Sequence, residues 1–193
     1  MIRCDWAAKG NDLMRLYHDE EWGVPVHDDL HHFEHLALET AQAGLSWAVV
    51  LNKREAYRRA FANFDAEKIA RFTPARVEKL LQNAGIIRNR AKINAMVTNA
   101  RAFLAVRDEF GSFDRFLWGF VDGRPIKNTW KVQTDLPART TISDALSIEL
   151  KRRGFKFVGS VVCYAHMQAV GLINDHLITC FRYRPCAALA RKS

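Results

Sequence analysis

The sequence predicts an all-α protein built as two closely packed helical lobes, and three observations lead to this fold class. Apolar residues recur at helical spacing in several long segments of the 193-residue chain. Glycine, proline and small polar residues separate these segments where helices begin and end. No segment shows the apolar–polar alternation of a half-buried strand. With 49% hydrophobic residues, the chain can also bury a substantial core.

The N-terminal part, residues 1–25, has little periodicity but is rich in tryptophan, tyrosine and histidine. Tryptophan in a short polar segment usually anchors that segment or lines a pocket. Gly23-Val24-Pro25 ends the segment, and Asp28 or Asp29 can cap the helix that follows.

The stretch FEHLALETAQAGLSWAVV, residues 33–50, is apolar on nearly every side from Leu36 on, and a helix of this kind is expected to be buried. Glu39 and Gln42 lie three residues apart within it, and so share one side of the helix. Two interpretations of Glu39 stay open at this point. Its carboxylate either faces a pocket that supplies hydrogen bonds or a cation, or belongs to a solvated stripe with His32 and His35.

More helices are expected after Gly44, which can end the buried helix. Ser46 and Thr73 are suitable N-caps, and Pro74 suits the first turn of a helix. These helices are predicted over residues 46–62, 65–71, 73–83, 88–108 and 113–120.

The segment 123–141 contains two prolines and has no period. It is predicted to be a loop and to mark the boundary between the two lobes. Ser143 is the expected cap of the next helix, which ends before Gly154.

Another apolar helix is predicted over 160–172, and a short helical stretch begins at Asn174. Residues 1–183 would then form a single domain. Residues 184–193 are expected to be a loosely ordered tail.

Charge is unevenly spread along the chain. Residues 1–40 hold three Lys and Arg against nine Asp and Glu, whereas 41–193 hold 26 against 12. This basic majority favours a polyanionic partner, most often nucleic acid, although a generally basic surface is the alternative. There is no apolar run long enough to span a membrane and no signal-peptide core. The four cysteines are therefore expected to be reduced or metal-bound in a cytoplasmic protein.

Two cysteines and two histidines form a candidate metal site. His176 and Cys180 are four residues apart, so on a helix both would point to one side. Cys4 and His18 lie near the other end of the chain. Together they have the composition of a closed structural zinc site, although buried cysteines and surface histidines would give the same pattern.

The segment LKRRGFKFVGSVVC, residues 150–163, has the pattern of helix, glycine-containing turn and helix. Backbone N–H groups at such a turn can bind phosphate, which is how a helix-hairpin-helix motif holds DNA without reading its bases. The candidate DNA contacts here are Lys151, Lys156 and Gly159, beside Arg152 and Arg153. A second candidate is the turn at Gly85, followed by Arg88, Arg90 and Lys92. Ordinary helix turns are the alternative at both places.

Several motifs carry a family resemblance: LETAQAGLSW, NAGIIRNRAKI, LKRRGFKFVG and GLINDH, with CDW and YHDEEWGVP near the N-terminus. Together they resemble the 3-methyladenine DNA glycosylase I family. The resemblance extends from Cys4 to about Cys180 and implies an α-helical member of the helix-hairpin-helix DNA glycosylase superfamily. Thr40 is a departure, because glycine is expected there in many members.

The resemblance also implies roles for particular residues. A structural zinc ion would be held by Cys4, His18, His176 and Cys180. The base pocket would contain Glu39, Tyr17 and Trp47, with Trp22 and Trp6 nearby. In the wider superfamily an aspartate precedes a histidine-bearing segment, but here Asn174 takes that place and Asp175 is displaced by one. The resemblance to this family implies that no aspartate needs to perform that role.

The implied activity is hydrolysis of the N-glycosidic bond of N3-methyladenine in double-stranded alkylated DNA. A monofunctional, monomeric enzyme would flip the cationic base out of the helix, release free 3-methyladenine and leave an abasic site. Tyr17 and Trp47 would stack on the base, while catalytic Glu39 would accept its N–H groups. Leu45 would wedge into the DNA, with Gln42 as the other candidate. A non-catalytic, zinc-stabilised DNA-damage sensor is the alternative.

Overall fold

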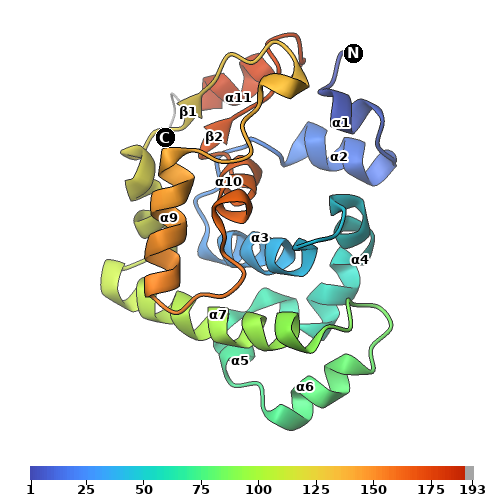
Figure 1. Ribbon diagram of the computed structural model, residues 1–193, viewed down its shortest axis with the longest axis vertical. Helices are drawn as coiled ribbons and strands as arrows, with labels where there is room; N and C mark the ends of the chain where they lie inside the picture. The colour runs from blue at the N-terminus through green and yellow to red at the C-terminus, as the bar shows by residue number, and fades with distance from the viewer. Residues whose placement is uncertain (190–193) are drawn as a thin grey trace.

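A computed structural model describes residues 1–189, and these residues are mostly helical, as predicted (Figure 1). The helices are α1 (Asp5–Ala8), α2 (Asp12–Glu20), α3 (Asp29–Gln42), α4 (Trp47–Ala60), α5 (Ala66–Ala70), α6 (Pro74–Leu81), α7 (Arg90–Phe110), α8 (Phe113–Trp118), α9 (Thr141–Arg152), α10 (Ser160–Ala169) and α11 (Tyr183–Leu189). Short 3-10 turns are η1 (Ala62–Phe64), η2 (Gly119–Val121) and η3 (Gln133–Asp135). Strands β1 (Ile126–Lys127) and β2 (Ile173–Asn174) pair in parallel. None of the helices described is long and apolar enough to cross a membrane.

Helix α3 lies at the centre of the molecule (Figure 1). Its N-terminus is capped by Asp28, whose carboxylate accepts a 2.9 Å hydrogen bond from the backbone N–H of His31. It ends before Gly44, which has a φ of +78° that favours glycine. Because α4, α7, α8 and α10 all pack against α3, nearly every side of this helix is buried.

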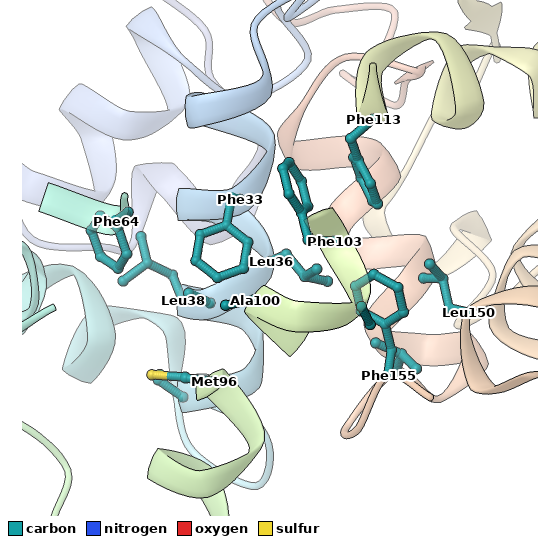
Figure 2. Close-up of a cluster of buried hydrophobic side chains, with 14 of the residues drawn as sticks. Phe33, Leu36, Leu38, Phe64, Met96, Ala100, Phe103, Phe113, Leu150 and Phe155 are labelled. Atoms are coloured by element: carbon teal, nitrogen blue, oxygen red, sulfur yellow. The ribbon is translucent and has the colours of Figure 1, made fainter. Parts of the chain in front are cut away.

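The main core lies where α3 packs against α7 and the α9–α10 hairpin (Figure 2). The ring of Phe33 meets that of Phe103 at a centroid distance of 5.1 Å, and Phe103 stacks on Phe113 at 4.3 Å. Leu150 and Phe155 bring the hairpin into the same core. Since each such side chain contributes about 1.5–3 kcal/mol when fully buried, this core fixes α3 relative to the hairpin.

A smaller apolar cluster joins the two ends of the chain. It contains Cys4, Tyr17, Trp22, Leu51, Leu177 and Cys180. The backbone N–H of Phe181 donates to the carbonyl of Ile2 at 2.9 Å. The segments before α3 and after β2 therefore form one body beside α3. The division of the chain into two lobes at 123–141 stays a prediction.

The structure corrects the start of α9 and the segment after α10. Thr140, not Ser143, is the N-cap; Ser143 is the third residue of the helix and completes a capping box with Thr140. No helix begins at Asn174, because that residue belongs to β2 and continues into the turn that carries His176 and Cys180.

The tail prediction is wrong for residues 184–189. These residues lie in α11, and Cys186 is buried against the rest of the protein. The burial of Cys186 holds α11 against the protein. The prediction of a loose tail had relied on the position of this segment near the end of the sequence. Residues 190–193 lie outside the described part of the chain.

Candidate active site and metal centre

The four predicted metal ligands come together from the two ends of the chain. The ligand atoms of Cys4, His18, His176 and Cys180 lie within 4.8 Å of one another, and all four residues are buried. Three sulfur-to-nitrogen distances are 3.5, 3.6 and 3.7 Å. A tetrahedral zinc with Zn–S of 2.3 Å and Zn–N of about 2.05 Å places such atoms about 3.6 Å apart. The group can therefore hold a metal ion, although its last two members lie in a turn and not on a helix.

Neighbouring groups hold both histidines in the tautomer that a metal requires. The Nδ1 of His18 donates to Asp19 at 2.7 Å, and the guanidinium of Arg3 holds that carboxylate. The Nε2 of His176 donates to the carbonyl of Trp22 at 2.9 Å. Each ring thus keeps its other nitrogen for the ion. The hydrogen bond from the Cys4 thiol is the largest effect that holds the pKa of Cys180 below its usual value, and this favours a thiolate at Cys180.

A cavity of about 380 Å³ lies beside the metal centre. Every residue predicted for the base pocket lines this cavity: Trp6, Tyr17, Trp22, Glu39 and Trp47. Gln42 lines it as well. Sequence reasoning missed the remaining wall, which comes from α10 and from the 123–141 loop: Gln133, Leu136, Val161, Val162, Ala165 and Gln168, with Met14 from α2. These residues carry no local signal, because only the tertiary fold brings them to α3.

Aromatic rings connect the cavity to the metal centre. Tyr17 and Trp47 have ring centroids 5.3 Å apart, and Trp6 meets Trp22 edge-on at 5.2 Å. Trp22 in turn contacts the ring of His176 at 4.6 Å. Loss of a metal would therefore disturb the aromatic wall of the cavity.

Glu39 faces this cavity with its carboxylate unpaired. The residue is 4% exposed, and its carboxylate makes no hydrogen bond or ion pair within residues 1–189. Burial alone raises its pKa to about 8. The solvated-stripe interpretation is wrong, since His32 and His35 are also buried and His32 binds Asp114 at 2.9 Å. A buried carboxyl with a strongly perturbed pKa in a cavity is typical of a functional site.

Comparison with known proteins agrees with this geometry. The sequence profile of the methyladenine glycosylase family matches residues 6–183. The chain belongs to this family. It is 48% identical over 183 residues to DNA-3-methyladenine glycosylase 1 of Escherichia coli K12, covering 95% of this chain and 97% of that one.

Solved structures of family members have the same fold. The crystal structure of a 3-methyladenine DNA glycosylase I matches with a TM-score of 0.90 at 51% identity, covering 93% of this chain and 98% of the other. A single-residue variant of such an enzyme, in complex with 3-methyladenine, matches with a TM-score of 0.91 at 35% identity, covering 95% and 98%.

In this methyladenine glycosylase family member, Asp175 is a structural group. Its carboxylate accepts four hydrogen bonds, from Asn128 (2.7 Å), Trp130 (2.7 Å), Tyr164 (2.5 Å) and Gln168 (2.7 Å). It is 1% exposed and does not line the cavity. With its acceptor sites occupied, it ties the 123–141 loop to α10 and is not placed to activate water.

The α9–α10 hairpin has fewer free cations than its sequence indicates. Arg153 binds Glu109 and Glu149, and Arg152 also binds Glu149. Lys151 and Lys156 are exposed and have no ion-pair partner within residues 1–189. They leave a modest positive charge beside the turn, and Gly159 is the N-cap of α10.

The turn at Gly85 is a weaker candidate than its sequence indicates. Lys92 is buried and donates to the carbonyls of Ala41 (2.8 Å) and Ala43 (2.6 Å), so it caps the C-terminus of α3. Arg90 forms an ion pair with Glu78. Of the three basic residues predicted there, two are already engaged within the protein.

The turn between α3 and α4 presents Leu45 to solvent. Leu45 is 39% exposed, which is high for leucine. The side-chain amide of Gln42 donates a hydrogen bond to the Leu45 carbonyl at 2.6 Å, which stabilises the turn. Since Gln42 also lines the cavity, this turn joins the cavity rim to a projecting apolar side chain.

Proposed function

We propose that the protein is a monofunctional DNA glycosylase that hydrolyses the N-glycosidic bond of N3-methyladenine in alkylated double-stranded DNA. The observation that carries this proposal is the unpaired carboxylate of Glu39 in a cavity walled by Tyr17 and Trp47. Support comes from relatives named DNA-3-methyladenine glycosylase and from a related structure in complex with 3-methyladenine.

The chemistry follows from the charge of the damaged base. Methylation at N3 makes adenine cationic, so its glycosidic bond breaks with the electron pair returning to the base, and water then adds to the sugar carbon. The flipped base would stack on Tyr17 and Trp47, which favour a cation by cation–π attraction. Glu39 would accept N–H groups of the base. A cation in the cavity stabilises the ionised carboxylate and lowers its pKa from about 8.

DNA binding would follow the helix-hairpin-helix pattern. Phosphate would contact the backbone N–H groups near Gly159, with Lys151 and Lys156 adding charge. Leu45 would enter the space left by the flipped nucleotide, with Gln42 holding its turn closed. Neutralising both lysines should weaken binding to all sequences about equally and reduce its salt dependence.

The metal would be zinc, bound by Cys4, His18, His176 and Cys180, and its role would be structural. With four protein ligands the ion has no open position for substrate, and it would supply folding stability by binding only the native state. Metal analysis of protein purified without chelator should give about one zinc per chain. Cys4→Ser should remove the zinc, whereas the buried control Cys163→Ser should keep it.

A base-release assay tests the proposed function. Alkylated duplex DNA is incubated with the protein, and free 3-methyladenine and abasic sites are quantified. Wild type should release the base, and Glu39→Gln should release it more slowly. Binding to damaged DNA without base release would contradict the proposal and favour the damage-sensor alternative.

A further inference from the structure

The turn between α3 and α4, which presents Leu45, is held by a lysine from another helix. Lys92 of α7 is buried, and its ammonium donates hydrogen bonds to the carbonyls of Ala41 at 2.8 Å and Ala43 at 2.6 Å. No carboxylate among residues 1–189 pairs with it, and burial alone lowers its pKa. A buried cation without a carboxylate partner costs free energy, and the negative end of the α3 dipole offsets only part of that cost. Since Gly44 already ends α3, what Lys92 adds is a fixed position for the turn.

The same face of α7 also holds the turn of the α9–α10 hairpin. Asn99 follows Lys92 by seven residues, which is two helical turns and about 10 Å along the helix axis. The side chain of Asn99 accepts a hydrogen bond from the backbone N–H of Lys156 at 2.7 Å and donates one to the carbonyl of Lys156 at 3.0 Å. One helix of 21 residues thus binds both turns that the proposed function places on DNA, the turn of Leu45 and the turn of Lys156 (Figure 1).

We propose that Lys92 is a positioning residue, which sets the place of Leu45 relative to the hairpin so that phosphate binding and insertion of the wedge occur together. When the hairpin binds the DNA backbone, α7 then fixes where along the duplex Leu45 enters. Without the two hydrogen bonds of Lys92 the turn after α3 shifts, and the hydrogen bond of Gln42 to the Leu45 carbonyl remains to stabilise it. A displaced wedge lowers the population of flipped nucleotide, and therefore the rate of base release. This inference rests on the proposed function and adds how the wedge is placed.

The test measures release of 3-methyladenine from alkylated duplex DNA. Lys92→Met keeps an unbranched apolar side chain that packs like the lysine stem, and it removes the donor. It should lower kcat/KM for base release by about tenfold to a hundredfold, the effect of a group displaced from its working position. Its affinity for free 3-methyladenine, measured by titration calorimetry, should stay close to that of wild type, because Lys92 does not line the cavity. Lys68→Met in α5, which removes a lysine with a side chain that is 70% exposed, is the matched control.

Leu45→Ala separates positioning of the wedge from general damage to the fold. In the Leu45→Ala background there is no wedge to place, so Lys92→Met should lower kcat/KM little further. Such non-additivity is expected of two residues that act through one element. If Lys92→Met does not fold, Lys92→Gln, which keeps a shorter N–H donor, is taken through the same comparison.

Three outcomes overturn the inference. The first is an equal kcat/KM in wild type and Lys92→Met. The second is the same fold loss with and without Leu45, which would mean that Lys92 only stabilises α3. The third is a loss of free-base affinity as large as the loss of kcat/KM, which would place the effect in the cavity. If wild type itself releases no 3-methyladenine, the proposed function is wrong rather than the role of Lys92.

Discussion

Two glutamates on α3, five residues apart, are buried to the same degree and have opposite surroundings. Glu34 is 5% exposed and Glu39 is 4% exposed. Glu34 accepts hydrogen bonds from Arg54 at 2.7 Å and Arg58 at 2.8 Å. The carboxylate of Glu39 has no partner among the described residues, and its pKa is raised to about 8.

The difference separates a structural carboxylate from a functional one. A buried charge with two guanidinium partners is compensated within the protein, and removing it leaves the partners uncompensated. A buried carboxyl that faces a cavity without a partner destabilises the empty protein and is retained for what binds there. Burial alone therefore does not identify the site on α3; the presence or absence of a partner does.

The largest effect is expected at Glu34, the structural carboxylate. Glu34→Gln should lower the free energy of unfolding by about 3 kcal/mol, the lower end for breaking a buried ion pair, because Arg58 is partly exposed. Base release per folded molecule should not change. Urea unfolding measures the first quantity, and Glu55→Gln, which removes an exposed partner of Arg58, is the control. A Glu34 variant with normal stability and impaired base release would reverse the assignment.

Substitution of Glu39, the functional carboxylate, should have the opposite effects on stability and on base binding. Glu39→Gln keeps the shape and removes the charge, so binding of free 3-methyladenine should weaken by roughly 1.5–3 kcal/mol, the range for hydrogen bonds to charged groups. Stability should be unchanged or higher, because an unpaired buried carboxyl has been removed. Titration calorimetry and urea unfolding are the two measurements. Equal affinity in wild type and variant would falsify the pocket assignment.

The raised pKa of Glu39 predicts how stability depends on pH. The carboxyl is protonated in the folded state below about pH 8, but in the unfolded state only below about 4.5. Between these values unfolding releases a proton, so this residue makes stability fall as pH rises, with a slope of up to about 1.4 kcal/mol per pH unit. Glu39→Gln should lack this contribution. Unfolding of both proteins from pH 5 to pH 8 measures it; parallel curves would contradict the shift.

The comparison also shows what the sequence predicts and what it does not. Glu39 in α3 and Trp47 at the start of α4 are close along the chain, and the family resemblance predicted that both line the base pocket. Gln133 reaches the same cavity only because the distant Asp175 binds its loop, and no local pattern encodes that contact. The metal ligands were predicted by residue type and family resemblance. The helix proposed to carry His176 and Cys180 was wrong, because β2 pairing extends the backbone just before them.

The smallest effect is expected at Thr40, the departure next to Glu39. Its hydroxyl donates to the carbonyl of Leu36 at 2.9 Å and accepts from the side chain of Asn99 at 3.3 Å. Asn99 also bonds both backbone groups of Lys156 in the hairpin turn. Thr40 does not line the cavity, so its role is structural, like that of Glu34, despite its position beside Glu39.

Thr40→Ala should therefore cost about 1 kcal/mol of unfolding free energy, the contribution of one hydrogen bond. Thr40→Ser, which keeps the hydroxyl, should lose less. Neither variant should change the affinity for free 3-methyladenine measured by calorimetry. A shift in that affinity for Thr40→Ala, with Thr40→Ser unchanged, would mean that the hydroxyl acts on the cavity through α3. The distinction between structural and functional residues of α3 would then fail at Thr40, the residue next to Glu39.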